Sequence, residues 1–196
     1  MQAVTDEESG RRNPRPEGSL TSLAFEIRPA TTSDIPAVHE MIGLLADYEK
    51  LAHLRVATEA DLASALFGER PAAEVLVACK NGEPAAFALF FHNFSTFLGR
   101  RGLWLEDLFV RPEHRRQGCA KALLHALAGL ARDRGCGRFE WAVLDWNASA
   151  IEFYQSLGAT VLPDWRIVRV VGSALDTMAD GGSEPEEPSR TRPLRG

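Results

Sequence analysis

The chain has 196 residues, and its 22 Lys and Arg against 27 Asp and Glu give a formal net charge of −5 at pH 7. A mildly acidic chain without a basic stripe does not suit a nucleic-acid backbone, and no apolar run is long enough to span a membrane. The N-terminus lacks the apolar stretch of a secretory signal. Three cysteines cannot all pair and show no metal-ligand spacing. These features predict a cytoplasmic protein that uses no metal, nucleic acid or membrane.

Both ends of the chain are too polar to pack into a core. Residues 1–22 and 176–196 are rich in Arg, Glu, Pro, Gly and Ser, so neither can bury enough surface to offset its ordering entropy. We therefore expect a disordered tail at each of these two ends. The remaining residues, 23–175, are long enough to form one domain with a sizeable core.

Strand and helix patterns alternate between the two tails. Runs of β-branched and aromatic residues predict strands, and the Asn81-Gly82 turn joins two of them into a hairpin. We expect strands at residues 23–28, 74–80, 84–93, 103–110, 138–144 and 165–171. Apolar residues three and four apart, preceded by capping residues, predict helices. We expect helices from Ser33 or Asp34 to near Lys50, from Thr58 to Leu66, over 119–132, and from Asn147 or Ser149 to Leu157.

The order of these elements predicts the fold class. Three consecutive strands with helices before and after them imply an α/β (α+β) fold with a mixed, mostly antiparallel central sheet. Helices would cover both faces of this sheet. The order does not match the repeated strand–helix pattern of a doubly wound dinucleotide fold.

The strongest chemical signal is the segment 110–121, which joins a buried strand to the longest helix. A helix start offers unpaired N–H donors and the positive end of the helix dipole. Gly118 lets the backbone approach an anion, Ala120 keeps a neighbouring position small, and Arg115 and Arg116 add positive charge. The segment suits a pyrophosphate, and the alternative interpretation is an ordinary basic loop before a helix.

At these residues the sequence resembles the GNAT acetyltransferase superfamily. Arg115-x-x-Gly118-x-Ala120 looks like its acetyl-CoA motif, Q/R-x-x-G-x-G/A. The stretches FEIRPATTSDIPAVHEMI and WNASAIEFYQSLGA resemble its opening strand and helix and its second cofactor-side motif. Shorter matches resemble the diamine (spermidine/spermine-type) acetyltransferases and their thialysine-acetylating relatives; they lie at 47–49, 67–71, 105–107, 145–147 and 153–154. Together the matches cover about 25–171.

The resemblance implies a GNAT fold with acetyl-CoA as co-substrate. Acetyl-CoA would lie in a V-shaped cleft where the parallel strands 103–110 and 138–144 separate. A bulge in the first strand would free backbone N–H groups for the pantetheine arm and the thioester carbonyl, where they would stabilise an oxyanion. The implied cofactor contacts are Leu108, Phe109, Val110, Arg115, Arg116, Gln117, Gly118, Cys119, Ala120, Lys121, Asn147, Ala148, Ser149, Ala150 and Tyr154.

Two residues are candidates for proton transfer in a direct acetyl transfer without an acyl-enzyme. Tyr154 matches the family tyrosine that protonates the departing CoA thiolate, and a phenol, with an ordinary pKa of about 10, suits a thiolate. Alternatively, Tyr154 is a packed aromatic residue. Glu106 would accept the proton of the incoming ammonium, or it is an acid paired with a nearby arginine. Strand alternation would place Glu106 and Leu108 on one face of the sheet, and Leu105 and Asp107 on the other. For Asp107 we expect a structural role.

The acceptor site is implied to use Tyr48, Glu49, Glu106, Glu140, Trp141, Ala142 and Asp164. Acids that the diamine enzymes carry after the Tyr-Glu pair are missing here, and Lys50 and Arg55 stand nearby instead. A long polycation needs several spaced carboxylates. We therefore expect a short diamine, or an amino acid with a side-chain amine such as thialysine, lysine or ornithine, whose carboxylate could meet one of the new cations.

Other interpretations of the sequence stay open at this point. The enzyme could acetylate a protein N-terminus, a protein lysine or the amine of a drug, or the chain could be a CoA-binding regulatory module without turnover. The resemblance also implies a homodimer. Cys119 is not needed as a nucleophile, but it lies in the phosphate turn, where alkylation would block the cofactor.

Overall fold

The computed structural model describes residues 25–182. Three parts of the prediction lie outside this range: the N-terminal tail, the first two residues of the expected strand 23–28, and the part of the C-terminal tail at 183–196. The described chain forms two compact units, one up to Ala142 and one from Val143 onward. Each unit is described by itself.

The first unit is built on a mixed five-stranded sheet in the order β1-β2-β3-β4-β5. Its first three pairings are antiparallel, and β4 and β5 are parallel. The strands are β1 Glu26–Pro29, β2 Glu74–Lys80, β3 Glu83–Ser95, β4 Arg100–Val110 and β5 Phe139–Trp141. The mixed sheet and the hairpin between β2 and β3 confirm the prediction, although β5 is shorter than the expected strand 138–144.

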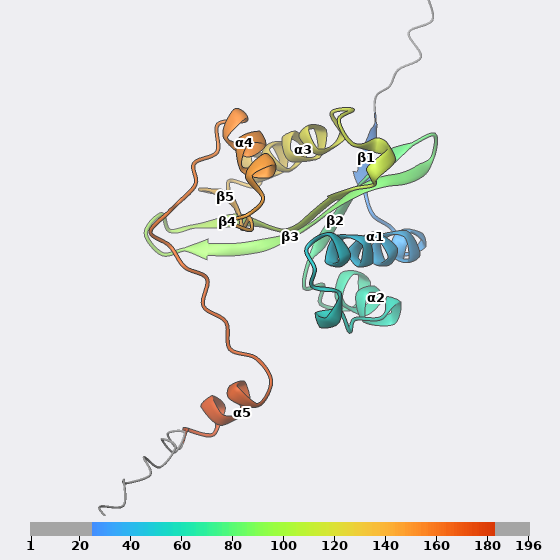
Figure 1. Ribbon diagram of the computed structural model, residues 1–196. Helices are drawn as coiled ribbons and strands as arrows, with labels where there is room; N and C mark the ends of the chain where they lie inside the picture. The colour runs from blue at the N-terminus through green and yellow to red at the C-terminus, as the bar shows by residue number, and fades with distance from the viewer. Residues whose placement is uncertain (1–24, 183–196) are drawn as a thin grey trace, which may run out of the picture. The chain divides into compact units, whose positions relative to one another are not determined.

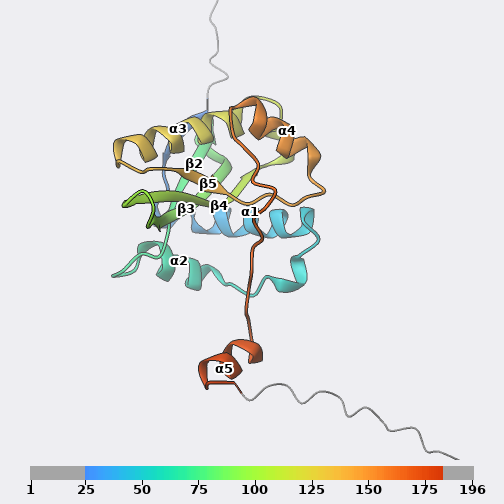
Figure 2. The same cartoon turned by 90° about the vertical axis from the view of Figure 1, so that its left-hand side faces the viewer.

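Helices cover both faces of this sheet, as predicted (Figures 1 and 2). Helix α1 packs on β3 and β4, and α2 packs on α1. Helix α3 lies across the other face against β1 to β4. The helices are α1 Ile35–Tyr48, α2 Glu59–Phe67 and α3 Cys119–Asp133. None of the described helices is long and apolar enough to cross a membrane.

Apolar periodicity explains why these helices pack as they do. Helix α1 buries Ile35, Val38 and Met41 against Phe87 and Phe109 of the sheet. Helix α3 turns a buried stripe to the sheet, formed by Cys119, Leu123, Leu124, Leu127 and Ala131. Burial of these side chains supplies the main favourable free energy for closing the two layers on the sheet.

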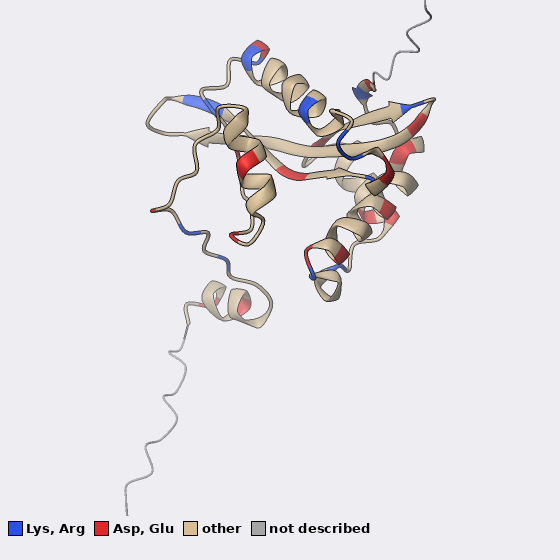
Figure 3. Ribbon diagram, turned by 45° about the horizontal axis from the view of Figure 1, so that its top comes forward, with Lys and Arg blue, Asp and Glu red and all other residues tan. Residues whose placement is uncertain are grey.

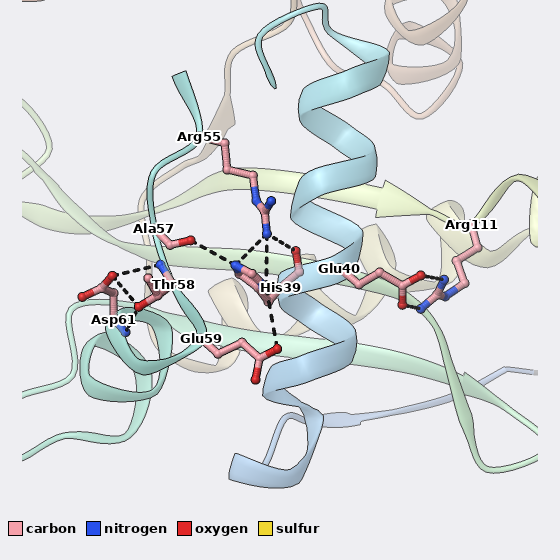
Figure 4. A network of polar contacts seen from close by, with 8 residues as sticks. All are labelled: His39, Glu40, Arg55, Ala57, Thr58, Glu59, Asp61 and Arg111. Atoms are coloured by element: carbon pink, nitrogen blue, oxygen red, sulfur yellow. Dashed lines mark hydrogen bonds and ion pairs between the residues drawn. The ribbon is translucent and has the colours of Figure 1, made fainter. Parts of the chain in front are cut away.

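Polar contacts hold the starts of α1 and α2 in place. Thr58 and Asp61 form the predicted reciprocal box at the start of α2, where the Thr58 N–H donates to Asp61 Oδ2 at 2.9 Å (Figure 4). Asp34 precedes α1 and accepts two hydrogen bonds from the Arg28 guanidinium, at 2.7 and 2.8 Å. This pairing holds the pKa of the Asp34 carboxyl well below its usual range. The buried acid therefore stays ionised and ties β1 to the start of α1.

The second unit holds α4 Ala148–Ser156 and α5 Ser173–Ala179. The prediction of α4 is confirmed, with Asn147 as its N-cap and Gly158 at φ 91° after its end. The predicted strand at 165–171 is wrong, because none of the described strands pairs with this segment and its side chains Trp165 and Val168 are 75% and 87% exposed. A β-branched run becomes a strand only when a neighbour pairs with it. Helix α5, which the sequence did not predict, crosses the expected start of the C-terminal tail at residue 176.

Candidate active site

The strands β4 and β5 separate near the middle of β4. Their ladder pairs Leu103 with Phe139 and continues only as far as Leu105 with Trp141. Strand β4 runs on to Val110. Backbone groups on this side of β4 beyond Leu105 are thus outside the ladder, where they can serve a ligand. An unpaired continuation of β4 beyond β5 agrees with the expected separation of these two parallel strands.

A register shift makes Glu106 an extra residue in β4. Leu89 of β3 pairs with Asp107, whereas the next residue of β3, Phe90, pairs with Leu105. Glu106 therefore has no partner across the β3–β4 ladder. Such a bulge bends the strand locally and redirects its side chains, and the resemblance to the family implied one in this strand.

The bulge overturns the prediction from strict alternation. Alternation would put Leu105 and Asp107 on the same face, but their partners Phe90 and Leu89 are consecutive and point to opposite faces. Leu89 packs against the core that α1 covers. Asp107 therefore lies on the α1 face of the sheet, and Leu105 lies on the opposite face.

Two further carboxylates, Glu49 after α1 and Glu106 in the bulge, act electrostatically on Asp107. Glu49 directly follows α1, and its partial burial raises its pKa. Asp107 is more deeply buried, and burial together with the charges of Glu106 and Glu49 raises its pKa to about 6. Glu106 is exposed and accepts a 2.9 Å hydrogen bond from Trp104 Nε1. The raised pKa values of Glu49 and Asp107 favour a cation or a proton beside these two acids. The role of Asp107 was not predicted from the sequence, because it depends on the bulge.

The loop before α3 suits an anion. Gly118 is the N-cap of α3 at φ 83°, and a Cβ built on it would meet no atom within 4 Å. The open space lies beside the first turn of the helix, whose N–H groups have no intrahelical partner. Arg116 also adopts a positive φ, 57°. Residues 116–121 therefore match the chemistry of the diphosphate of acetyl-CoA.

Several basic residues belong to this loop, which joins β4 to α3 (Figure 3). Lys80 Nζ donates to Gln117 Oε1 at 2.7 Å, and Gln117 Nε2 donates to the Glu113 carbonyl at 2.8 Å. Lys80 was not predicted from the sequence, since it comes from the β2–β3 hairpin. Arg115 Nε donates to the Val110 carbonyl at 3.0 Å, so its side chain is held at the end of β4.

Cys119 is a poor target for alkylation. Only 2% of it is exposed, and burial raises the pKa of its thiol to about 11. Because the thiolate is the reactive form, we expect iodoacetamide at neutral pH to label the half-buried Cys136 before Cys119, as peptide mass spectrometry would show. Cys136→Ser should remove this early label. Rapid labelling of Cys119 that acetyl-CoA prevents would contradict the expectation.

The predicted acceptor residues on β5 do not all lie with the acids. Glu140 pairs with Arg138 Nε at 2.7 Å and accepts a hydrogen bond from Asn93 Nδ2 at 3.1 Å. Its charge is therefore already partly compensated. Trp141 is the partner of Leu105 and shares its face, away from Asp107. Ala142 follows the strand and is exposed.

The remaining predicted residues belong to the second unit. Asn147 Oδ1 accepts a 3.3 Å hydrogen bond from the Ala150 N–H, which fixes the start of α4. Ala148 and Ser149 open the helix and are exposed. Tyr154 lies within α4, half-buried, with its ring 5.5 Å from that of Phe153. Asp164 is exposed in the segment that follows α4.

The two basic residues after Glu49 differ in what they contact. Arg55 Nη2 lies 2.6 Å from His39 Nε2 and 3.4 Å from the His39 carbonyl, folded back on α1 (Figure 4). Lys50 is exposed and has a φ of 64°, which is unusual for a residue with a side chain. Lys50 is thus the cation available beside Glu49, while Arg55 is engaged by α1.

Comparison with known proteins agrees with this geometry. The model of the acetyltransferase (GNAT) family matches residues 40–159. The chain is 36% identical to an L-ornithine acetyltransferase of Arabidopsis thaliana, with 85% of this chain and 93% of that protein covered. It is 38% identical to a thialysine N-epsilon-acetyltransferase of Caenorhabditis elegans, with 80% and 98% covered. An integron cassette protein of V. cholerae has a similar structure, with a TM-score of 0.67, 27% identity, and 80% and 98% covered.

The unpaired end of β4, the bulge at Glu106 and the glycine turn before α3 match the features that the resemblance implies for an acetyltransferase site. The chain belongs to the GNAT acetyltransferase family. It is an N-acetyltransferase, and the family uses acetyl-CoA as co-substrate. The predictions of the family, the fold and the enzyme class are thereby confirmed.

Proposed function

We propose that the protein acetylates a primary amine of a short diamine or a diamino acid, such as thialysine, ornithine or lysine. The observation that carries this proposal is the group formed by Glu49, Glu106 and Asp107 at the end of α1. Three neighbouring acids provide a site for an ammonium group. The named activities of the ornithine and thialysine acetyltransferases give the same class of acceptor.

The proposed chemistry assigns a step to each side chain. Glu106 and Asp107 together accept the proton that leaves the ammonium, so that the neutral amine can attack the thioester carbonyl carbon. Backbone N–H groups of 108–110 stabilise the oxyanion as the new C–N bond forms. The C–S bond then breaks, and Tyr154 donates its phenolic proton to the departing thiolate. Residues 116–121 and 147–150 hold the diphosphate and the pantetheine arm.

We infer that the charged residues at and after the end of α1 determine how long an acceptor the site prefers. The site has three acids near one point, which compensates one ammonium group rather than a long row of them. Lys50 follows Glu49 and is the cation that would meet the carboxylate of an amino-acid acceptor. Arg55 is excluded from this role by its contact with His39. Glu140 is not counted among the acids of the acceptor site, because it is paired with Arg138.

A panel of acceptors tests this proposal. We expect thiol release from acetyl-CoA to be fastest with thialysine, ornithine or putrescine and slowest with spermine, with mass spectrometry locating the acetyl group. Lys50→Ala should lower kcat/KM for the amino-acid acceptors and leave kcat/KM for putrescine nearly unchanged. A clear preference for spermine, a peptide or an aminoglycoside would refute the acceptor class. CoA binding by calorimetry without turnover of any amine would instead favour a regulatory module.

We further propose that the protein is a homodimer in the cytoplasm. The exposed apolar side chains of 165–171 offer a segment that a second copy could cover. Cys79, Cys119 and Cys136 are all free thiols, as a reducing compartment requires. Light scattering at several protein concentrations tests the assembly, and a monomeric mass throughout would refute it.

A further inference from the structure

Arg115, the first residue of the phosphate motif, is held by groups outside the phosphate-binding amides. Its Nε donates to the Val110 carbonyl at 3.0 Å. Its guanidinium carbon lies 5.5 Å from the ring centre of Tyr48 and 5.5 Å from that of Phe109. Both distances lie within the range of an attractive cation–π contact. The cation therefore interacts with two aromatic faces.

These contacts join two parts of the proposed active site. Tyr48 is the last residue of α1 and directly precedes Glu49, one of the three acids. Phe109 belongs to the buried core beneath α1, and Val110 ends the strand that leads into the phosphate loop. One guanidinium thus connects the acceptor end of α1 with the start of the cofactor loop.

A second arginine of the same segment strengthens this connection. Arg111 makes two hydrogen bonds to the Glu40 carboxylate, at 3.1 and 2.7 Å (Figure 4). Glu40 stands about two helical turns before Tyr48 on α1. The segment between β4 and α3 is therefore fastened to α1 at two points. A displacement of this loop would therefore displace the end of α1 that carries Tyr48.

We propose that Arg115 is a positioning residue for the acceptor, which holds Tyr48 and couples amine binding to occupation of the phosphate loop. This inference rests on the proposed function. Because the Arg115 guanidinium contacts Tyr48 and Phe109, we assign diphosphate binding to Arg116 and the backbone amides of the loop. By linkage, CoA must tighten acceptor binding by the same factor by which the acceptor tightens CoA binding.

Variants of Arg115 separate this role from phosphate binding. Arg115→Met removes the cation but keeps an apolar stem, and Arg115→Lys restores the cation. We expect Arg115→Met to raise the KM for thialysine about tenfold, within the range of a single-site coupling. The calorimetric Kd for CoA should change by less than about threefold, and Arg115→Lys should recover most of the loss. Arg116→Met, the matched control, should instead raise the Kd for CoA.

A double-mutant cycle with Tyr48 adds a second readout. If Arg115 acts through Tyr48, Arg115→Met should add little to the thialysine KM of Tyr48→Leu, since the shared contact is already lost. Tyr48→Phe keeps the ring and should keep the coupling to Arg115. Tyr48→Leu alone should also abolish the tightening of thialysine binding by CoA, so this test stands even if Arg115→Met does not fold.

The opposite pattern would overturn the inference. A tenfold rise in the Kd for CoA with an unchanged thialysine KM would make Arg115 a phosphate ligand. Additive effects of Arg115→Met and Tyr48→Leu would show that the two residues act independently. Failure of the proposed function is a distinct result, because the wild-type protein would then turn over neither thialysine nor ornithine.

Discussion

Replacing Tyr154 by Phe should lower kcat by about 100-fold, the lower range for loss of a positioned acid. Phe keeps the ring, so its packing in α4 beside Phe153 and the start of the helix at Asn147 should be preserved. The substitution removes the phenolic hydroxyl, which is the proposed proton donor to the departing thiolate. Because CoA contacts many other groups, its calorimetric Kd should change by less than about threefold.

The other tyrosine supplies the control for this prediction. The chain has 2 tyrosines, Tyr48 and Tyr154. Tyr48→Phe keeps the ring over which Arg115 lies and should reduce kcat far less than Tyr154→Phe does. An acetyl donor with a more acidic thiol leaving group, such as an aryl thioester, should be least sensitive to Tyr154→Phe. Equal losses of kcat in the two variants would contradict the role of Tyr154 as the acid.

Local patterns were sufficient to predict the framework of the first unit. The Thr58–Asp61 cap, the Asn81-Gly82 hairpin and the apolar stripe of α3 each depend on residues close in sequence. Their interactions are therefore visible before the chain folds. The anion-binding turn at Gly118 is predictable for the same reason, since its φ and its helix start are local properties.

The arrangement of the acids depends on contacts between distant segments. The bulge at Glu106 arises from how β4 pairs with β3, and no local pattern distinguishes it from a regular strand. Asp107 and Leu105 therefore lie on opposite faces of the sheet, although alternation predicts one shared face. The same limit explains the segment 165–171, whose β-branched residues predict a strand only if another segment pairs with it.

The contacts of long side chains also could not be predicted from the sequence pattern. The motif indicated that Arg115 adds charge beside a diphosphate, but nothing in the sequence indicated that its guanidinium lies against Tyr48 and Phe109. Lys80, from another hairpin, contacts the loop through Gln117. A motif fixes the backbone of a binding turn more firmly than the destination of its flexible side chains.

The raised pKa of Asp107 predicts a cost in stability that increases with pH. Folding raises this pKa from 3.8 to about 6, so the folded protein binds the proton more tightly than the unfolded chain does. The free energy of unfolding must therefore fall as pH rises through the interval between these two values. A shift of about two units corresponds to about 3 kcal/mol in full.

Asp107→Asn should consequently raise the stability of the protein and lower its activity. The amide removes the buried charge, so the free energy of unfolding should exceed that of the wild type by about 1–3 kcal/mol at neutral pH. The free energies of unfolding of the two proteins should converge near pH 4. Below this pH the wild-type acid is protonated in the unfolded chain as well as in the folded protein. With half of the proton-accepting pair gone, kcat/KM for the amine should fall about 100-fold. Urea unfolding across this pH range, alongside kcat/KM for thialysine, measures both effects.

Glu106→Gln is the matched comparison, because Glu106 is the exposed neighbour of Asp107 in the same strand. It should lower kcat/KM with almost no pH-dependent gain in stability. A stability difference between wild type and Asp107→Asn that stays constant from pH 4 to neutral pH would mean that Asp107 titrates normally. The bulge would then direct an ordinary carboxylate to the α1 face, and the proton would have to leave the amine through Glu106 alone.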